Sequence, residues 1–152
     1  NISSGYSFAV QSFETTIPEE NVAHGKQYCF LIGSNVLLSN GSWKPIQDIQ
    51  IGDLVKDKYG MDVPVLDSFV WNIDDDIKMY TKDSLTVTDG HPLWVDEKWQ
   101  TADELGWDNK LTYVDNLYYL ETEDSYIVEH VPVSGKLAKT HPGKSIKHKG
   151  EL

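Results

Sequence analysis

Short apolar runs, interrupted every few residues by turn-forming dipeptides, dominate this chain from residue 28 onward. The runs hold mainly β-branched and aromatic residues, and Asn-Gly, Tyr-Gly and Asp-Gly pairs separate several of them. Such runs, about 4–8 residues long between turn signals, are typical of strands, whereas a helix needs a longer amphipathic segment. The pattern predicts an all-β domain of many short antiparallel strands with little helix. The runs cover residues 29–32, 36–38, 54–55, 63–71, 77–80, 85–87, 92–95, 111–114, 117–120 and 126–133.

Helix is predicted at two places only. Residues 46–49 hold enough apolar periodicity for a single turn. Residues 101–105 begin with a threonine that can cap a short helix, and Asp103 and Glu104 then lie in its first turn, where acidic side chains are favourable.

Size and charge limit the class of protein. The 152 residues, of 17.2 kDa, suffice for one domain, and a hydrophobic content of 39% with 5 Trp and 8 Tyr can fill a core. The net charge is −11, and every one of the 13 basic residues is a lysine. A nucleic-acid partner is therefore not expected, because phosphate binding needs a basic face and favours arginine.

The chain divides into three segments by composition. Residues 1–28 are rich in small polar residues and are interpreted as the end of an upstream polypeptide, residues 29–135 as the folded domain, and residues 136–152 as a basic tail. The tail carries five lysines against one glutamate, 5 − 1 = +4. No stretch approaches the roughly 18 apolar residues of a membrane span, and no signal peptide is recognisable. The cellular compartment is left open.

Cys29 is the single cysteine of the chain, so an intrachain disulfide is excluded. A lone cysteine is commonly a small buried hydrophobe. It acts instead as a nucleophile where the fold supplies a partner histidine. Both interpretations are open on the cysteine alone.

Two sequence blocks resemble a known family. The first, CFLIGSNVLLSNGSWKPIQDIQIGDLV, begins at Cys29, and the second, LTVTDGHPLWV, covers residues 85–95. Together, in this order, they closely resemble the Hint family of hedgehog and intein self-processing domains. Members of that family begin with a nucleophilic cysteine and later carry a T-x-x-H-P motif. The resemblance implies a disk-like or horseshoe-shaped Hint fold and autoprocessing at the Tyr28–Cys29 bond.

The chemistry of that bond assigns roles to three side chains. In an N-to-S acyl shift, the Cys29 thiol attacks the carbonyl of Tyr28, and the peptide nitrogen must gain a proton as the C–N bond breaks. His91 is the candidate general acid, because an ordinary imidazole has a pKa near neutrality. Thr88 can hold the bent peptide by hydrogen bonding to its backbone. Alternatively, a T-x-x-H-P motif is ordinary turn chemistry with an exposed histidine.

The last strand departs from the splicing members of the family, which end in Y-x-x-x-G-x-x-V-H-N. When the chain is aligned on Tyr126 and Val133, the family's Gly falls on His130, its penultimate His on Ser134 and its terminal Asn on Gly135. Gly has no side chain to cyclise, and the residue that follows is a lysine rather than a Ser, Thr or Cys acceptor. Splicing by the usual route is therefore not expected.

What remains is N-terminal cleavage without a splicing step. The Asp or Cys that the family often has on the preceding strand corresponds here to Tyr119. The partners are then the upstream polypeptide in cis and, as acceptor, water or a small nucleophile such as an amine. The alternative is an inactive Hint-fold module with a structural or interaction role in a larger secreted or virion-type protein.

No metal or cofactor is predicted. The remaining histidines lack the close pairing of a zinc site, and the Asp74–Asp76 run lacks the Gly and distal Glu of a calcium loop, so it is interpreted as a charged hairpin tip. The histidines are His24, His130, His141 and His148. The Hint interpretation further predicts Cα atoms of Cys29 and Ser134 within about 10 Å. It also predicts an imidazole nitrogen of His91 within about 4 Å of the Cys29 nitrogen.

Overall fold

The computed structural model describes residues 29–136 and 147–148. The predictions made for residues 1–28, for His141 and for most of the 136–152 tail lie outside the described residues. Within them the chain is built of antiparallel strands with a single 3-10 turn, which confirms the all-β prediction. None of the described residues form a helix that is long and apolar enough to cross a membrane.

The largest sheet has six strands in the order β2-β1-β10-β11-β7-β8, with every neighbouring pair antiparallel. It brings a strand from the start of the domain beside the last hairpin, because Val36 of β1 pairs with Val128 of β10. The last strand, β11, lies in turn beside β7 through the pair Val133 and Leu93. The strands are β1 (Asn35–Leu37), β2 (Trp43–Pro45), β7 (Leu93–Val95), β8 (Lys98–Gln100), β10 (Ser125–Val128) and β11 (Val131–Ser134).

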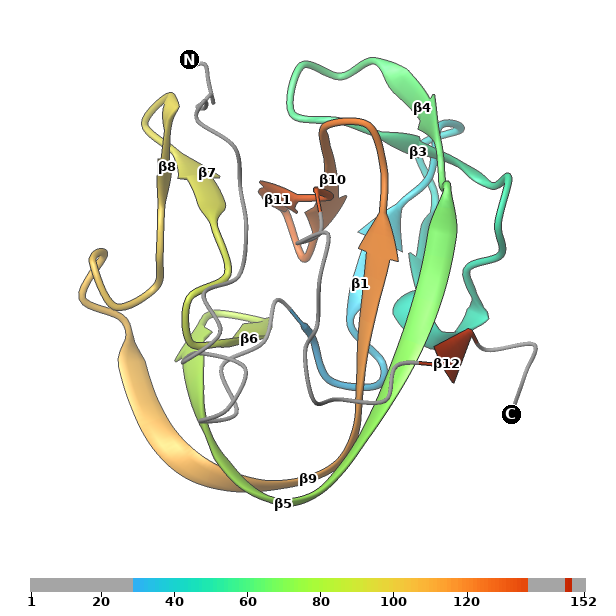
Figure 1. Ribbon diagram of the computed structural model, residues 1–152. Helices are drawn as coiled ribbons and strands as arrows, with labels where there is room; N and C mark the ends of the chain where they lie inside the picture. Colours follow the sequence, from blue (N-terminus) through green and yellow to red (C-terminus); the bar gives the residue numbers. More distant parts are fainter. Residues whose placement is uncertain (1–28, 137–146, 149–152) are drawn as a thin grey trace.

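A long curved ribbon of β5 (Asp67–Lys82) and β9 (Asp108–Glu121) runs around one side of the domain and gives it a horseshoe outline (Figure 1). β6 (Leu85–Thr88) and the short β12 (Lys147–His148) both pair with β5. A separate two-stranded sheet contains β3 (Leu54–Lys56) and β4 (Asp62–Pro64).

The ribbon strands are longer than the apolar runs predicted. The Asp74–Asp76 run is not a hairpin tip: it lies inside β5, where the register with β9 shifts between Asn72 and Asp75. Asp74 adopts a positive φ of 49° there. A bulge of this kind keeps the backbone paired on both sides of an extra residue, so an exposed charged stretch continues the strand. The hydroxyl of Tyr113 on β9 donates to the Asp74 carboxylate across the ribbon.

Helical structure is limited, as predicted. The 3-10 turn η1 (Ile46–Asp48) is the expected single turn, with Ile46 buried. Thr101 forms the expected cap, because its Oγ1 accepts the Glu104 N–H while Glu104 Oε1 accepts the Thr101 N–H. The segment does not continue as a helix. Gly106, at φ 77°, reverses the chain, and the Trp107 N–H bonds back to the Ala102 carbonyl.

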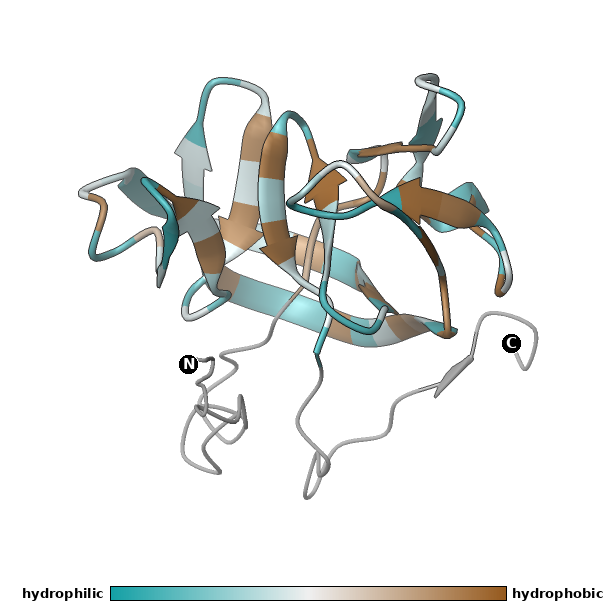
Figure 2. Cartoon of the chain, turned by 90° about the horizontal axis from the view of Figure 1, so that it is seen from above, coloured by the Kyte–Doolittle hydropathy of each residue, from teal (hydrophilic) through white to brown (hydrophobic). Residues whose placement is uncertain are grey.

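Buried apolar side chains form two clusters. The larger fills the space between the sheets and includes Phe30, Val87 and Val133 from the start, middle and end of the domain. The smaller lies against the β5–β9 ribbon and includes Cys29 and Tyr119. Figure 2 shows the hydrophobic segments gathered in the middle of the domain and hydrophilic segments on the loops and part of the ribbon.

Candidate functional site

Cys29 enters the fold beside Phe30, which is fixed between two strands. The Phe30 N–H donates to the Tyr118 carbonyl at 2.8 Å, and the Tyr118 N–H donates to the Phe30 carbonyl at 2.9 Å. Phe30 also bridges to Val87 of β6. The Cys29 side chain is fully buried. The first described residues of the chain are therefore held in the interior, between β9 and β6.

Thr88, the last residue of β6, holds the Cys29 backbone from both sides. Its Oγ1 accepts a hydrogen bond from the Cys29 N–H at 3.0 Å, and its own N–H donates to the Cys29 carbonyl at 3.2 Å. The Cys29 N–H belongs to the peptide bond that joins the cysteine to residue 28. The buried Thr88 thus contacts the nitrogen of the Tyr28–Cys29 bond, which the sequence predicts to be the cleavage site.

His91 follows Thr88 after the turn at Gly90, whose φ is 94°, and is almost completely buried. Its Nε2 lies 3.1 Å from the Ser134 carbonyl oxygen, and its ring centroid lies 4.8 Å from that of Phe30. A carbonyl oxygen only accepts, so Nε2 carries the hydrogen and Nδ1 is the unprotonated nitrogen. His91 therefore connects the start of the domain to the end of its last strand.

The protonation of His91 differs from that of an ordinary histidine. Burial lowers the pKa of His91 to about 3, and the hydrogen bond to the Ser134 carbonyl opposes this only in part. The imidazole is consequently neutral at neutral pH. The near-neutral pKa on which its role as an acid was based does not hold for the resting site.

This shift predicts a pH-dependent stability. Between pH 6.5 and about 3 the unfolded chain binds a proton at His91 that the folded chain does not, so acid destabilises the fold. We expect His91 to account for a loss of about 2 kcal/mol in unfolding free energy between pH 7 and pH 5. Urea unfolding of the native chain and of His91→Gln at both pH values measures it. The variant should lack this part of the pH dependence, and an identical pH dependence in the two proteins would contradict the assignment.

Cys29 and Tyr119 face each other across neighbouring strands. Because Phe30 and Tyr118 exchange both backbone hydrogen bonds, the preceding cysteine and the following tyrosine form the adjacent pair, whose side chains approach closely. Burial raises the pKa of the Cys29 thiol well above its usual value, so the thiol is protonated at rest. Burial also raises the pKa of the Tyr119 hydroxyl. Tyr119 therefore stands beside the thiol, at the position where the family often has Asp or Cys.

Gly135 is enclosed at the end of β11. Its N–H donates to the Asp124 carbonyl at 3.0 Å, and its carbonyl accepts the Thr122 N–H at 2.9 Å. A Cβ atom at this position would lie 2.1 Å from Thr122 Oγ1 and 3.0 Å from the Thr122 nitrogen. Thr122 Oγ1 is itself fixed by donating to the Ser125 carbonyl at 3.0 Å. The fold has no room for an Asn side chain here.

Gly135→Ala is therefore expected to destabilise the domain by about 1–3 kcal/mol, because the new methyl group displaces the Thr122 hydroxyl. Thr122→Ala removes that hydroxyl, so the loss in the double variant should be smaller than the sum of the two single losses. Urea unfolding of the four proteins of this cycle measures the coupling. Strictly additive losses would contradict the steric account.

His130 lies apart from these contacts. It occupies the turn between β10 and β11 with a φ of 73°, and its ring packs against Trp43 at a centroid distance of 4.7 Å. Thr88 thus contacts the Cys29 backbone, and His91 contacts the Ser134 carbonyl, whereas His130 packs against an edge strand. The predicted separations of Cys29 from Ser134 and from the His91 ring stay predictions.

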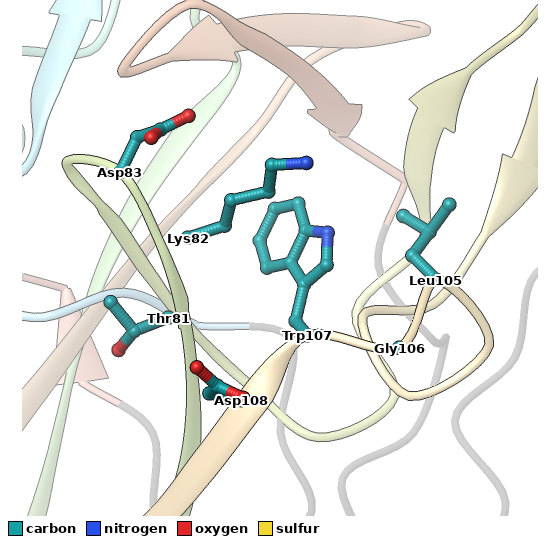
Figure 3. A pocket seen from close by; sticks show the side chains of 7 residues that line it. All are labelled: Thr81, Lys82, Asp83, Leu105, Gly106, Trp107 and Asp108. Atoms are coloured by element: carbon teal, nitrogen blue, oxygen red, sulfur yellow. The ribbon is translucent and has the colours of Figure 1, made fainter.

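A surface hollow of about 410 Å³ opens at the β5–β6 turn (Figure 3). Lys82 and Trp107 face the same space in it, and neither Cys29 nor His91 is part of its lining. Its lining residues are Thr81, Lys82, Asp83, Leu105, Gly106, Trp107 and Asp108. Within residues 29–136 no three His, Cys, Asp or Glu side chains gather as metal ligands would.

Comparison with known proteins decides the family. A family model described as "Vint: Hint-domain" matches residues 28–140, which is most of the chain. The chain belongs to the Hint-domain family. The match begins one residue before Cys29 and includes Thr88, His91 and the whole of β11. No curated protein sequence matches this Hint domain.

Solved structures show the same fold. The DnaB intein from Synechocystis sp. PCC 6803 is 12% identical, with a TM-score of 0.57, and the match covers 71% of this chain and 98% of the intein. A bacterial intein-like domain from Clostridium thermocellum is 19% identical with a TM-score of 0.56, over 71% and 98% of the two chains. The gp41-1 intein is 15% identical with a TM-score of 0.55, over the same shares. At these identities the likeness concerns the fold alone.

Proposed function

We propose that this Hint domain cleaves its own chain between Tyr28 and Cys29 through a thioester, without splicing. The observation that carries the proposal is the contact of Thr88 Oγ1 with the Cys29 N–H at 3.0 Å. It places a fixed polar group on the nitrogen that must leave the acyl carbon. His91 follows three residues after Thr88, beyond the turn at Gly90, which supports a role for it at the same peptide bond.

The resting protonation states suggest the order of proton transfers. The neutral His91 has an unprotonated Nδ1, which can accept the thiol proton as Sγ of Cys29 bonds to the Tyr28 carbonyl carbon. The imidazolium then returns this proton to the Cys29 nitrogen, the C–N bond breaks, and the C–S bond of the thioester remains. His91 acts first as base and then as acid. Burial opposes full charge on either group, so the proton moves only as the C–S bond forms.

Two groups hold the reacting atoms while the proton moves. Thr88 keeps the Cys29 peptide in place through its side chain and its backbone. The Ser134 carbonyl accepts from Nε2 and so selects the tautomer of His91 in which Nδ1 is unprotonated. The strands β6 and β11 fix these groups before the reaction begins, which reduces the ordering that the transition state requires.

The thioester is then resolved by an external nucleophile and not by a side chain of the last strand. Gly135 supplies no side chain to cyclise, and the Thr122 hydroxyl fills the space that such a side chain would need. Water or a small nucleophile therefore releases the upstream polypeptide. No product that joins Tyr28 to Lys136 is expected at any stage.

One observation favours a second candidate, an inactive Hint-fold module with a structural role. The Cys29 thiol is fully buried in an apolar cluster, and burial raises its pKa. Such thiols are generally inert. The two candidates differ in whether a thiol reagent releases a fragment.

Mass spectrometry of the freshly prepared full-length chain, with and without dithiothreitol, distinguishes them. Under the proposed function, dithiothreitol attacks the thioester and produces a fragment that begins at Cys29. A fragment that forms at another bond, or that forms equally fast in Cys29→Ala, would contradict the proposal. A chain that stays intact for days under both conditions would support the structural module.

A further inference from the structure

The Lys58 side chain is enclosed by three aromatic rings. Its Nζ lies 4.4 Å from the centroid of the Tyr59 ring, 4.9 Å from that of Trp94 and 5.3 Å from that of Trp99. The two indole rings come from a cross-strand pair of β7 and β8 and meet edge to face at 5.0 Å. All three distances are within the roughly 6 Å over which a ring face attracts a cation.

A carboxylate completes the enclosure. Asp124 Oδ2 lies 2.6 Å from Lys58 Nζ, and only 6% of the lysine side chain is exposed. The backbone also fixes the residue, because the Lys58 N–H donates to Ser125 Oγ at 2.8 Å. We call the group of Tyr59, Trp94, Trp99 and Asp124 the aromatic cage.

Other ion-paired lysines of the described chain lack such an enclosure. Lys44 pairs with Asp53 and Lys56 with Asp62, and their side chains remain 34% and 28% exposed. A partner carboxylate alone therefore does not explain the position of Lys58. Three ring faces and a carboxylate together match the chemistry of a desolvated ammonium group.

We propose that the aromatic cage is a binding site for an ammonium group and that Lys58 fills it in cis. The class of ligand is a primary or methylated alkylammonium ion. Lys58 lies in the turn that begins at Asp57. The Asp57 carboxylate accepts hydrogen bonds from the N–H groups of Tyr59 and Met61, so the turn holds Lys58 in a fixed position. This pre-organisation makes the intramolecular ligand stronger than a free one.

Occupancy of the cage is connected to the end of the domain. The Asp124 carbonyl accepts the Gly135 N–H at 3.0 Å, and the Asp124 side chain accepts from Ser125 Oγ at 2.7 Å. Ser125 in turn pairs with Ser134. Loss of the ammonium group from Asp124 should therefore loosen the backbone at residues 134 and 135. This consequence does not depend on the proposed cleavage.

Chemical rescue tests the site. Lys58→Ala empties the cage, and we expect its melting temperature to fall by roughly 5 °C or more. Methylammonium chloride at about 100 mM should restore roughly 3 °C of this loss, whereas NaCl at the same ionic strength should not. Lys44→Ala removes an ion-paired lysine that has no aromatic cage, and it is the matched control. Its melting temperature should respond equally to the two salts.

Two further measurements identify the site of rescue. In Lys58→Ala, amide hydrogen exchange at Gly135 should accelerate and should slow again with methylammonium. Adding Trp99→Leu to Lys58→Ala should abolish both responses. In the native chain the ε-methylene protons of Lys58 should resonate well upfield of those of other lysines, because they lie over ring faces.

The outcomes that overturn the proposal are distinct from a simple loss of stability. Equal effects of methylammonium and NaCl on Lys58→Ala would show a general salt effect. A variant that remains unfolded at every methylammonium concentration would show that the ion does not bind in the aromatic cage. An ordinary chemical shift for Lys58 in the native chain would show that the cage is not occupied by this lysine.

Discussion

Cys29→Ala is expected to leave the chain uncut between residues 28 and 29, in dithiothreitol and in hydroxylamine, for as long as the protein stays folded. Alanine has no nucleophilic atom, so the acyl group cannot leave the peptide nitrogen. The side chain is fully buried and packs in an apolar cluster, so loss of one sulfur atom should leave the fold intact. Mass spectrometry measures cleavage, and circular dichroism verifies the fold.

Cys29→Ser is the matched control for this variant. It keeps an oxygen nucleophile of similar size, and we expect slow cleavage through an ester that hydroxylamine resolves. Cleavage of Cys29→Ala at the native rate would mean that the bond breaks without the thiol, and the thioester mechanism would be wrong.

Loss of His91 is expected to slow thiol-induced cleavage by about 10²–10⁴-fold, the usual contribution of one positioned acid–base group. His91→Gln is the preferred variant, because its amide can still donate to the Ser134 carbonyl but cannot carry a proton between the thiol and the nitrogen. The rate of fragment formation at fixed thiol concentration measures the effect.

His130→Ala is the control for that measurement. His130 packs on Trp43 in the β10–β11 turn, so its loss should change the rate by no more than about twofold. Equal losses in the two variants, or none in either, would show that His91 does not move the proton.

The strand-rich fold and the pairing of Thr88 with Cys29 were accessible from the sequence for a common reason. Short β-branched and aromatic runs between turn pairs indicate strands locally, and the T-x-x-H-P motif keeps Thr88 and His91 at one turn regardless of what surrounds them. The single turn that begins at Ile46 was also predicted from local sequence alone.

Features that depend on distant contacts were not accessible. The Asp74–Asp76 run looked like a hairpin tip, because no local pattern shows that β9 continues to pair across a bulge. The low pKa of His91 results from burial beneath Phe30 and β11, which the motif does not encode. Two further contacts join residues that are far apart in the chain: Gly135 packs against Thr122, and the aromatic cage surrounds Lys58. No residue spacing in the sequence predicts either contact.

The central claim is that the Tyr28 carbonyl passes from nitrogen to the Cys29 sulfur, and the new C-terminus on residue 28 tests it most directly. Hydroxylamine attacks a thioester far faster than an amide. The account therefore predicts that the released segment ends in a Tyr28 hydroxamate, identified by its mass, and that the companion fragment begins with Cys29. Two results would contradict it: a released segment that ends only in a carboxylate even at the highest hydroxylamine concentration, or no release from the folded chain.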